Sequence, residues 1–349
     1  MLRKTIKPNL TKSTQTKPRL MMAGVAFAAL AVSASAAAAQ THYDMISFGG
    51  ASNTPVWVAQ SKGFFKKEGL DMSFTTTRSS KKEIADFLAG KYQFMTTAFD
   101  NIVAYIEGQG DVKQAGAGDL VAIMGVHEGM NSVVARPEIK SFADIKGHPI
   151  AVDAVRSGYA TVLYEILDNK AGLKFDKDYS VIAVGSTSAR MEAMEQNKAV
   201  AAIINTPTDM EAQKKGYKIL ADATEAVGAY QGSAYVVSRK WAKAHEKDVM
   251  AYTRAVVAGH DYVYNNKAGT IEVLKAHIKG LSDADAERLY TRLTGPGGIS
   301  KHAAISIPGV EKVLALRDEW SVPKTKSGKP QKYIDTSYQE KAVAQEKTK

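Results

Sequence analysis

Small polar and aromatic residues follow several predicted strands, at positions where a sheet can hold a ligand. In open α/β sheets, ligands bind at the carboxyl ends of strands, where helix N-termini carry unpaired N–H groups and a partial positive charge. Hydroxyl and amide groups gathered there suit a small polar ligand, including an anion. The candidate ligand-binding residues are Asn53, Trp57, Thr96, Thr97, Asp100, Arg156, Ser157, Gly158, Tyr159, Thr187, Arg190, Asn205 and Tyr230.

The uncharged candidates also have purely structural explanations. Helix capping alone can explain Ser157, as it can explain Thr54 and Ser188. Trp57 can pack in the core, and Tyr230 can belong to a turn before a strand. These alternatives stay open at the level of the sequence.

The charged candidates have alternatives as well. Arg156 and Arg190 can lie on the surface, although a guanidinium one turn into a helix can hold an anion through two hydrogen bonds. Asp100 can cap a helix, or it can pair with the ammonium group of an amine-bearing ligand.

The sequence lacks the usual signatures of catalysis and of metal binding. It has no cysteine, no G-x-S-x-G or G-x-x-x-x-G-K-[ST] motif, and no two histidines at metal-ligand spacing. His127-Glu128 has no partner histidine nearby and is typical of a loop pair. We therefore expect no catalytic residue, no metal and no cofactor, with a triad assembled from distant residues left open.

The elements that position the candidates alternate between strand and helix. This alternation predicts an α/β fold with a mostly parallel sheet and helices on its faces. The predicted strands are 43–49, 70–75, 92–95, 120–126, 132–135, 149–152, 179–184, 200–204, 217–220 and 234–237.

Several helix starts are marked by capping residues. Thr54 before Pro55 predicts one N-cap, the run Ser80 to Glu83 predicts a capping box, and Asp100 predicts a third cap. A longer helix is predicted over residues 157–170, with Gly172 beyond its end.

The first 39 residues have the three parts of a secretory signal. They combine a basic stretch, a short apolar run from Met21 to Val32 and small residues ending in Ala37-Ala38-Ala39. An N-terminal membrane anchor is the alternative, but a run of about twelve residues is shorter than the roughly 20 that a span needs. Cleavage after Ala39 would release a soluble protein into the periplasm, not embedded in a membrane.

The charge balance does not favour nucleic acid as a partner. The chain has 46 basic and 36 acidic residues, and six of the basic ones lie in the predicted signal. Many of the remaining lysines fall between Lys324 and Lys349, which is typical of a solvated tail. No basic run is interleaved with aromatic residues, as a single-strand binder would require.

Four stretches resemble one family of proteins. The run from Asn53 to Leu70 resembles the opening of nitrate/sulfonate/bicarbonate-type periplasmic binding proteins of ATP-driven importers, a family that includes proteins for taurine and for pyrimidine precursors of thiamine. Further similarity lies in 142–147, in 150–153 and in 230–233 with Trp241. The resemblance covers most of residues 43–340.

The resemblance implies a two-lobed periplasmic-binding-protein fold of type II. It predicts one lobe from residues 42–132 and 233–349, a second lobe from 133–232, and hinges at two crossover strands near 131–135 and 232–237. It also implies a monomeric, non-enzymatic solute-binding protein that delivers a small molecule to an ABC permease with its ATPase. The family's ligand loops correspond to Asn53 with Trp57, to Thr96-Thr97, to 157–159, to Thr187 and to Asn205.

The class of ligand is less sharply indicated. Arg156, Arg190 and the helix N-termini favour a sulfonate or a carboxylate, whereas a zwitterion or a pyrimidine would make more use of Asp100. Family members often carry an acid where this chain has Gln93 and Val200, which leaves the substrate subgroup open. An enzyme of related fold and a scaffold acting through the lysine-rich tail are the rival functions.

Overall fold

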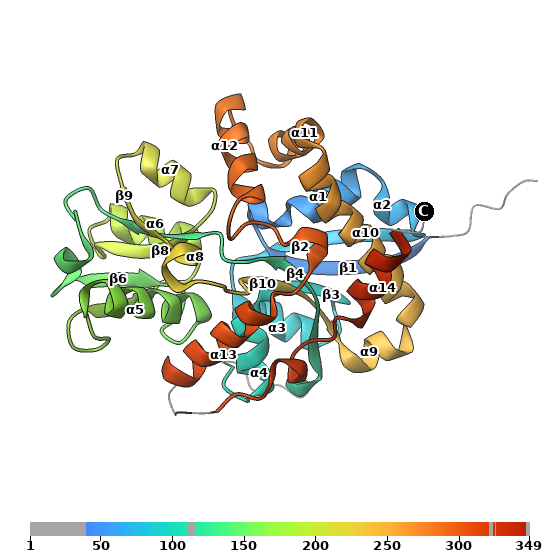
Figure 1. The fold of residues 1–349 in the computed structure, drawn as a ribbon, viewed down its shortest axis with the longest axis horizontal. Coiled ribbons are helices and arrows are strands. Elements are labelled where there is room, and N and C mark those ends of the chain that lie inside the picture. Colours follow the sequence, from blue (N-terminus) through green and yellow to red (C-terminus); the bar gives the residue numbers. More distant parts are fainter. Residues whose placement is uncertain (1–39, 111–115, 321–323, 325, 347–349) are drawn as a thin grey trace, which may run out of the picture. The chain divides into compact units, whose positions relative to one another are not determined.

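The structure is a computed structural model that describes residues 40–110, 116–320, 324 and 326–346 (Figure 1). The predicted secretory signal, residues 1–39, lies outside the described residues and stays a prediction. Two five-stranded sheets, flanked by helices, form the framework.

The first sheet has the strand order β2-β1-β3-β10-β4. β1 runs parallel to β2 and β3, whereas β10 runs antiparallel to β3 and β4. Leu70 and Met72 are buried and Asp71 is exposed, as in a half-buried strand, but the alternation ends at Phe74, which is exposed. The strands are β1 Thr41–Phe48, β2 Leu70–Thr77, β3 Phe94–Ala98, β4 Leu120–His127 and β10 Ser233–Ser238.

The second sheet has the strand order β7-β6-β8-β5-β9. β6 runs parallel to β7 and β8, and β5 runs antiparallel to β8 and β9. The strands are β5 Asn131–Ala135, β6 Pro149–Val152, β7 Ser180–Ala183, β8 Ala201–Asn205 and β9 Lys218–Asp222.

The chain passes between the two sheets twice. It leaves the first sheet after β4, enters the second at β5, and returns from β9 to β10. Because β5 and β10 arrive from the other sheet, each is antiparallel to its neighbours. This topology confirms the two-lobed α/β fold with two crossover strands. The proposed residue bounds of the lobes, 42–132 with 233–349 and 133–232, stay a prediction.

Helices cover the faces of both sheets. α6 and α7 lie on one side of the second sheet and α5 on the other (Figure 1). Among the helices in the described ranges, none is long and apolar enough to cross a membrane. The helices are α1 Thr54–Ser61, α2 Phe64–Lys67, α3 Ser80–Leu88, α4 Phe99–Ile106, α5 Gly158–Ala171, α6 Thr187–Glu195, α7 Thr208–Lys214, α8 Ala223–Val227, α9 Arg239–Ala244, α10 Glu246–Asn265, α11 Lys267–His277, α12 Asp283–Thr294, α13 Ile307–Trp320 and α14 Ser337–Glu346.

Three predicted helix caps are wrong, and so is the alternative that Ser188 caps a helix, because the N-cap of α6 is Ser186. The N-cap of α1 is Asn53, so that Thr54 is the first helical residue, and its hydroxyl donates to the carbonyl of Ala51 instead. The N-cap of α3 is Ser79, because that residue is extended and its Oγ accepts from the N–H of Lys82. The predicted capping box from Ser80 to Glu83 is therefore absent at this helix start.

The third wrong cap is Asp100. It lies inside the first turn of α4, where the N-cap position is held by Ala98. Its carboxylate is engaged by Arg317, so it is not free to accept from the backbone. The predicted start of α5 is confirmed, since Ser157 accepts from the N–H of Ala160 and Gly172 ends the helix in a left-handed conformation.

Candidate ligand-binding site

A cleft of about 620 Å³ lies where strand ends of both sheets meet. Residues at the ends of β1, β2 and β3 of the first sheet, or just after them, line it, and so do residues at or just after the ends of β6, β7 and β8 of the second sheet. The lining segments are 48–50, 76–81 and 96–98 from the first sheet and 153–154, 157–159, 185–188 and 205–206 from the second. The cleft therefore lies at the carboxyl ends of three parallel strands in each sheet, where α/β sheets bind ligands.

The cleft brings together most of the residues that the sequence singled out. The lining includes Thr96, Thr97, Ser157, Gly158, Tyr159, Thr187, Arg190 and Asn205. They come from strand ends and helix starts of both lobes, far apart in the chain. Their roles in ligand binding stay predictions.

Asn53 and Trp57 lie outside the lining. Asn53 is buried, and its Nδ2 donates to the carbonyl oxygens of Phe48 at 2.7 Å and Gly50 at 3.3 Å, so it braces a loop that does line the cleft. Trp57 stacks on His277 with ring centroids 4.6 Å apart and an interplanar angle of 3°. Both residues support the first sheet's side of the cleft from behind.

Asp100, Arg156 and Tyr230 also lie outside the lining. The Asp100 carboxylate accepts from Arg317 Nε at 2.6 Å and from Arg317 Nη2, so it is not available to the ammonium group of a ligand. Arg156 is exposed, and only its carbonyl takes part in this network, accepting from Arg317 at 3.2 Å. Tyr230 is buried beside Asp100, which contributes to the raised pKa of its phenol after burial itself.

Gly158 shows why the start of α5 needs a residue without a side chain. A Cβ at this position would lie 2.4 Å from the Cβ of Asp100 and 2.9 Å from the hydroxyl oxygen of Tyr230. The first turn of α5, from the second sheet, therefore packs directly against α4 of the first sheet. This close approach holds the N–H groups of that turn at the cleft.

Three helices begin at the cleft with a serine cap. Ser79, Ser157 and Ser186 each accept one backbone N–H of α3, α5 and α6 respectively. A single side-chain cap leaves other N–H groups of the first turn without an intrahelical partner. All three N-termini line the cleft, and each contributes partial positive charge there.

Arg190 lies beneath the second sheet's side of the cleft and is buried, with 3% of its surface exposed. Its Nε donates to the carbonyl of Ile203 and its Nη1 to that of Gly185, both at 2.8 Å. Its Nη2 donates to Thr187 Oγ1 and Asn205 Oδ1, both at 3.0 Å. Burial lowers the pKa of the guanidinium, and the nearby charge of Asp153 opposes that shift.

The charged side chains along the cleft are mostly basic. Arg78, Lys81 and Arg190 lie in the lining together with one acid, Asp153, whose carboxylate accepts from the hydroxyl of Ser157. The cleft is therefore polar and electropositive. Within the described part of the chain, no group of three or more His, Asp or Glu side chains is placed to hold a metal ion.

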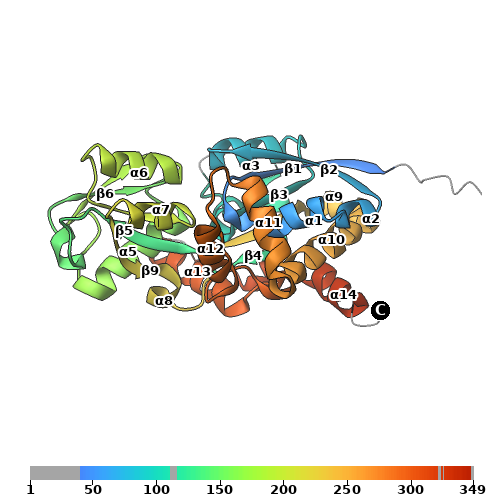
Figure 2. The same cartoon turned by 90° about the horizontal axis from the view of Figure 1, so that it is seen from above.

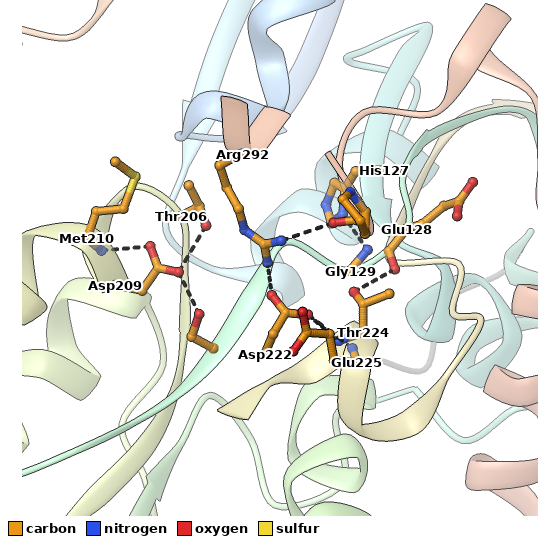
Figure 3. Close-up of polar contacts among 12 residues, drawn as sticks. His127, Glu128, Gly129, Thr206, Asp209, Met210, Asp222, Thr224, Glu225 and Arg292 are labelled. Carbon is orange, nitrogen blue, oxygen red and sulfur yellow. Dashed lines mark hydrogen bonds and ion pairs between the residues drawn. The ribbon is translucent and has the colours of Figure 1, made fainter. Parts of the chain in front are cut away.

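His127, interpreted from the sequence as part of a loop pair, is instead the last residue of β4. It is buried, it lines the cleft, and its Nδ1 accepts from the N–H of Gly129 at 3.2 Å (Figure 3). Burial, with a smaller contribution from the charge of Arg292, lowers its pKa to about 4. The ring is therefore neutral at pH 7, and because Nδ1 accepts, the proton lies on Nε2.

Asp153 was not among the predicted site residues, although it lines the cleft. Asp153 follows β6 directly, so the strand-end rule contained a signal for it. Asn101 lies one turn from Thr97 and donates to its Oγ1 at 3.0 Å.

Outside the cleft lining, polar contacts also join segments of the two lobes. Arg292 of α12 pairs with Asp222 at the end of β9, and the hydroxyl of Thr224 donates to the carbonyl of Glu128 at 3.3 Å (Figure 3). α12 also lies beside α7 (Figure 2), and Lys214 of α7 forms an ion pair with Asp285 of α12. These contacts span the segments that connect the two sheets.

Comparison with known proteins settles the family. The sequence profile described as NMT1/THI5 like matches residues 51–269, which is more than half of the chain. The chain belongs to the NMT1/THI5 like family. Among curated proteins it is similar to "Putative binding protein YtlA" of Bacillus subtilis (strain 168), with 25% identity over 223 residues. That match covers 62% of this chain and 64% of the relative.

Two solved structures have a fold similar to that of this chain. The periplasmic nitrate-binding protein NrtA from Synechocystis PCC 6803 matches with a TM-score of 0.70 and 12% identity, over 88% of this chain and 89% of its own. The alkanesulfonate-binding protein SsuA from Xanthomonas axonopodis pv. citri, bound to MOPS, matches with a TM-score of 0.62 and 18% identity, over 81% and 92%. At these identities the likeness shows the shared fold.

Proposed function

We propose that this protein is an extracytoplasmic solute-binding protein that captures a small organic anion in the cleft and delivers it to an ABC permease with its ATPase. The observation that carries the proposal is the cleft itself. Its volume of about 620 Å³ suits a small molecule, and loops from both sheets contribute to it. A ligand that contacts both lobes at once favours the closed state of a two-lobed protein.

The anionic ligand class rests on the electrostatics of the cleft. Three helix N-termini and three basic side chains surround it, against the single carboxylate of Asp153. Hydroxyl, amide and backbone N–H groups can replace the hydration shell of a sulfonate or a carboxylate. Two proteins of similar fold are described as binding nitrate and alkanesulfonate, which is consistent with this class.

The remaining parts of the proposal concern place and partners. We propose that residues 1–39 direct export to the periplasm, that the protein acts as a monomer, and that it binds its ligand without transforming it. The names of its structural neighbours, one a periplasmic nitrate-binding protein and one an alkanesulfonate-binding protein, support the periplasmic place and the binding role.

A zwitterion is the second candidate ligand, and one observation favours it. Asp153 lines the cleft and can pair with an ammonium group, a role that the sequence had suggested for Asp100. A zwitterion would place its anionic end at the helix N-termini and its amine near Asp153. Aminosulfonates and amino acids therefore belong beside simple anions in a ligand screen.

A thermal-shift screen tests the proposal. The purified protein is heated with sulfonates, carboxylates, aminosulfonates, amino acids and pyrimidines. A true ligand at 100 times its dissociation constant adds about 2.7 kcal/mol to the free energy of unfolding. Asn205→Ala should abolish most of that gain, whereas Glu311→Gln, an exposed position on α13, should retain it. Conversion of any bound compound to a product would contradict the proposal.

A further inference from the structure

The contacts of Arg190 determine how the neighbouring Asn205 faces the cleft. Asn205 Oδ1 accepts from Arg190 Nη2 at 3.0 Å and from Thr187 Oγ1 at 2.8 Å. A guanidinium has only donors, so the carboxamide atom beside it has to be the oxygen. The Nδ2 group must then point the other way. Among the described residues it has no hydrogen-bond partner, although Asn205 lines the cleft.

The same argument fixes the hydroxyl of Thr187. Its oxygen accepts from Arg190 Nη2, and its proton goes to Asn205 Oδ1. A hydroxyl has one proton, so Thr187 has no donor left for a ligand. The two residues thus present different groups: Asn205 offers two N–H donors and Thr187 offers a lone pair.

Arg190 itself has little left to offer a ligand. Four of its hydrogen bonds go to oxygens of the protein: two carbonyls, one hydroxyl and one carboxamide. A guanidinium has five N–H donors, so at most one remains. With 3% of its surface exposed, the side chain lies behind Thr187 and Asn205 as seen from the cleft.

We propose that Arg190 is a positioning residue that locks the Asn205 carboxamide with its N–H groups toward the cleft, so that Asn205, and not the guanidinium, binds the oxygen of an anionic ligand. The ligand contact rests on the proposed function, whereas the orientation of the carboxamide does not. The site then selects a group that accepts hydrogen bonds at this point and discriminates against one that donates.

Two probes of nearly equal shape test the selectivity. Ethanesulfonate presents acceptor oxygens, and ethanesulfonamide replaces one of them with an NH₂ donor. The wild-type protein should bind the sulfonate about 10- to 100-fold more tightly, as expected for hydrogen bonds to a charged group. Asn205→Asp replaces the donors with acceptors and should reverse the preference. Both affinities are measured by calorimetry on folded protein, so their ratio does not depend on stability.

Arg190→Lys tests the positioning role against an equally buried control. Lysine keeps the charge but cannot hold Thr187, Asn205 and the two carbonyls together, so the selectivity ratio should fall about threefold or more below that of the wild type. Arg317→Lys changes an arginine that is 4% exposed and outside the lining, and it should leave the ratio unchanged. An unchanged ratio in Arg190→Lys, with binding retained, would overturn the proposal.

Neutron diffraction on deuterated crystals of the unliganded protein tests the orientation without any ligand. The expected result places the deuterons of Asn205 Nδ2 on the cleft side. Deuterons of Asn205 pointing toward Arg190 would overturn the inference. If neither probe binds and the orientation is as expected, the anionic ligand class fails while the positioning role stands.

Discussion

Two buried arginines, one behind each side of the cleft, are satisfied in different ways. Arg317 of α13 closes on the carboxylate of Asp100, and this charge raises its pKa against the opposing effect of burial. Arg190 reaches carbonyl, hydroxyl and carboxamide oxygens, and burial lowers its pKa. Among the described residues, no carboxylate lies within 4 Å of the Arg190 guanidinium, so its charge lacks the direct counter-ion that Arg317 has.

The difference shows how to distinguish a structural charge from one available to a ligand. Burial is nearly equal at the two arginines, so burial alone does not separate them. What differs is the charge of the partner. Arg317 with Asp100 is a closed ion pair, whereas Arg190 retains positive charge next to the cleft. An anion bound there would be stabilised by that charge through Asn205 and Thr187.

The largest effect should come from breaking the closed pair. Asp100→Ala leaves the buried Arg317 without a counter-ion and should lower the free energy of unfolding by about 3–5 kcal/mol. Arg190→Met should lower the free energy of unfolding by less. This variant removes the buried charge itself, so it leaves no unpaired charge behind. Urea denaturation measures both. Equal losses at the two sites would contradict the comparison.

Adding a side chain at Gly158, at the start of α5, should lower the free energy of unfolding by a smaller amount. Gly158→Ala places a methyl group 2.4 Å from the Cβ of Asp100, which forces α5 and α4 apart. Overpacking of this kind costs about 1–3 kcal/mol. Gly118→Ala is the matched control, because nothing lies within 4 Å of its Cβ. Thermal unfolding should detect a loss only in Gly158→Ala, together with weaker ligand binding.

Glu83 contrasts with Asp100 as a buried acid without a counter-ion. Among the described residues, no ion pair neutralises its carboxyl group, and burial raises its pKa well above the usual value of 4.5 against a smaller opposing effect of Thr97. The folded state therefore holds a proton that the unfolded state releases, so stability is fully present below pH 4.5 and is lost as the pH rises toward the folded pKa.

Glu83→Gln removes this dependence. Relative to the wild type, the variant should gain stability by at most about 1.4 kcal/mol for each pH unit above 4.5, up to the folded pKa. Denaturation midpoints between pH 4 and pH 9 measure the difference. A constant difference across this range would show that Glu83 does not titrate there.

The smallest effect belongs to a third, more exposed arginine. Arg292 pairs with Asp222, with about a fifth of each side chain exposed, so solvent screens this pair more than it screens Arg317 with Asp100. Arg292→Gln should change the free energy of unfolding by no more than about 1 kcal/mol. Its effect should instead appear in lobe closure, which small-angle scattering with and without ligand can follow. A loss comparable with that of Asp100→Ala would contradict this ranking.

The sequence predicted those features that have a local signal. Strand alternation and capping residues led to Thr96, Ser157, Thr187 and Asn205, because strand ends and helix starts are marked by nearby residues. It did not predict that Asp100 pairs with Arg317, which lies 217 residues away. Nor did it show that Trp57 stacks on His277 rather than facing the cleft. Tertiary packing determines which distant residues meet in this way. Such contacts produce no periodic pattern of residues in the sequence.

A crystal structure with the strongest ligand from the screen tests the central claim most directly. The account predicts an unchanged molecule in the cleft, with an anionic oxygen about 2.7–3.2 Å from Asn205 Nδ2 and from N–H groups at the start of α5 or α6. A ligand bound outside the cleft, an oxygen held by the Arg190 guanidinium in place of Asn205, or a reaction product would contradict it.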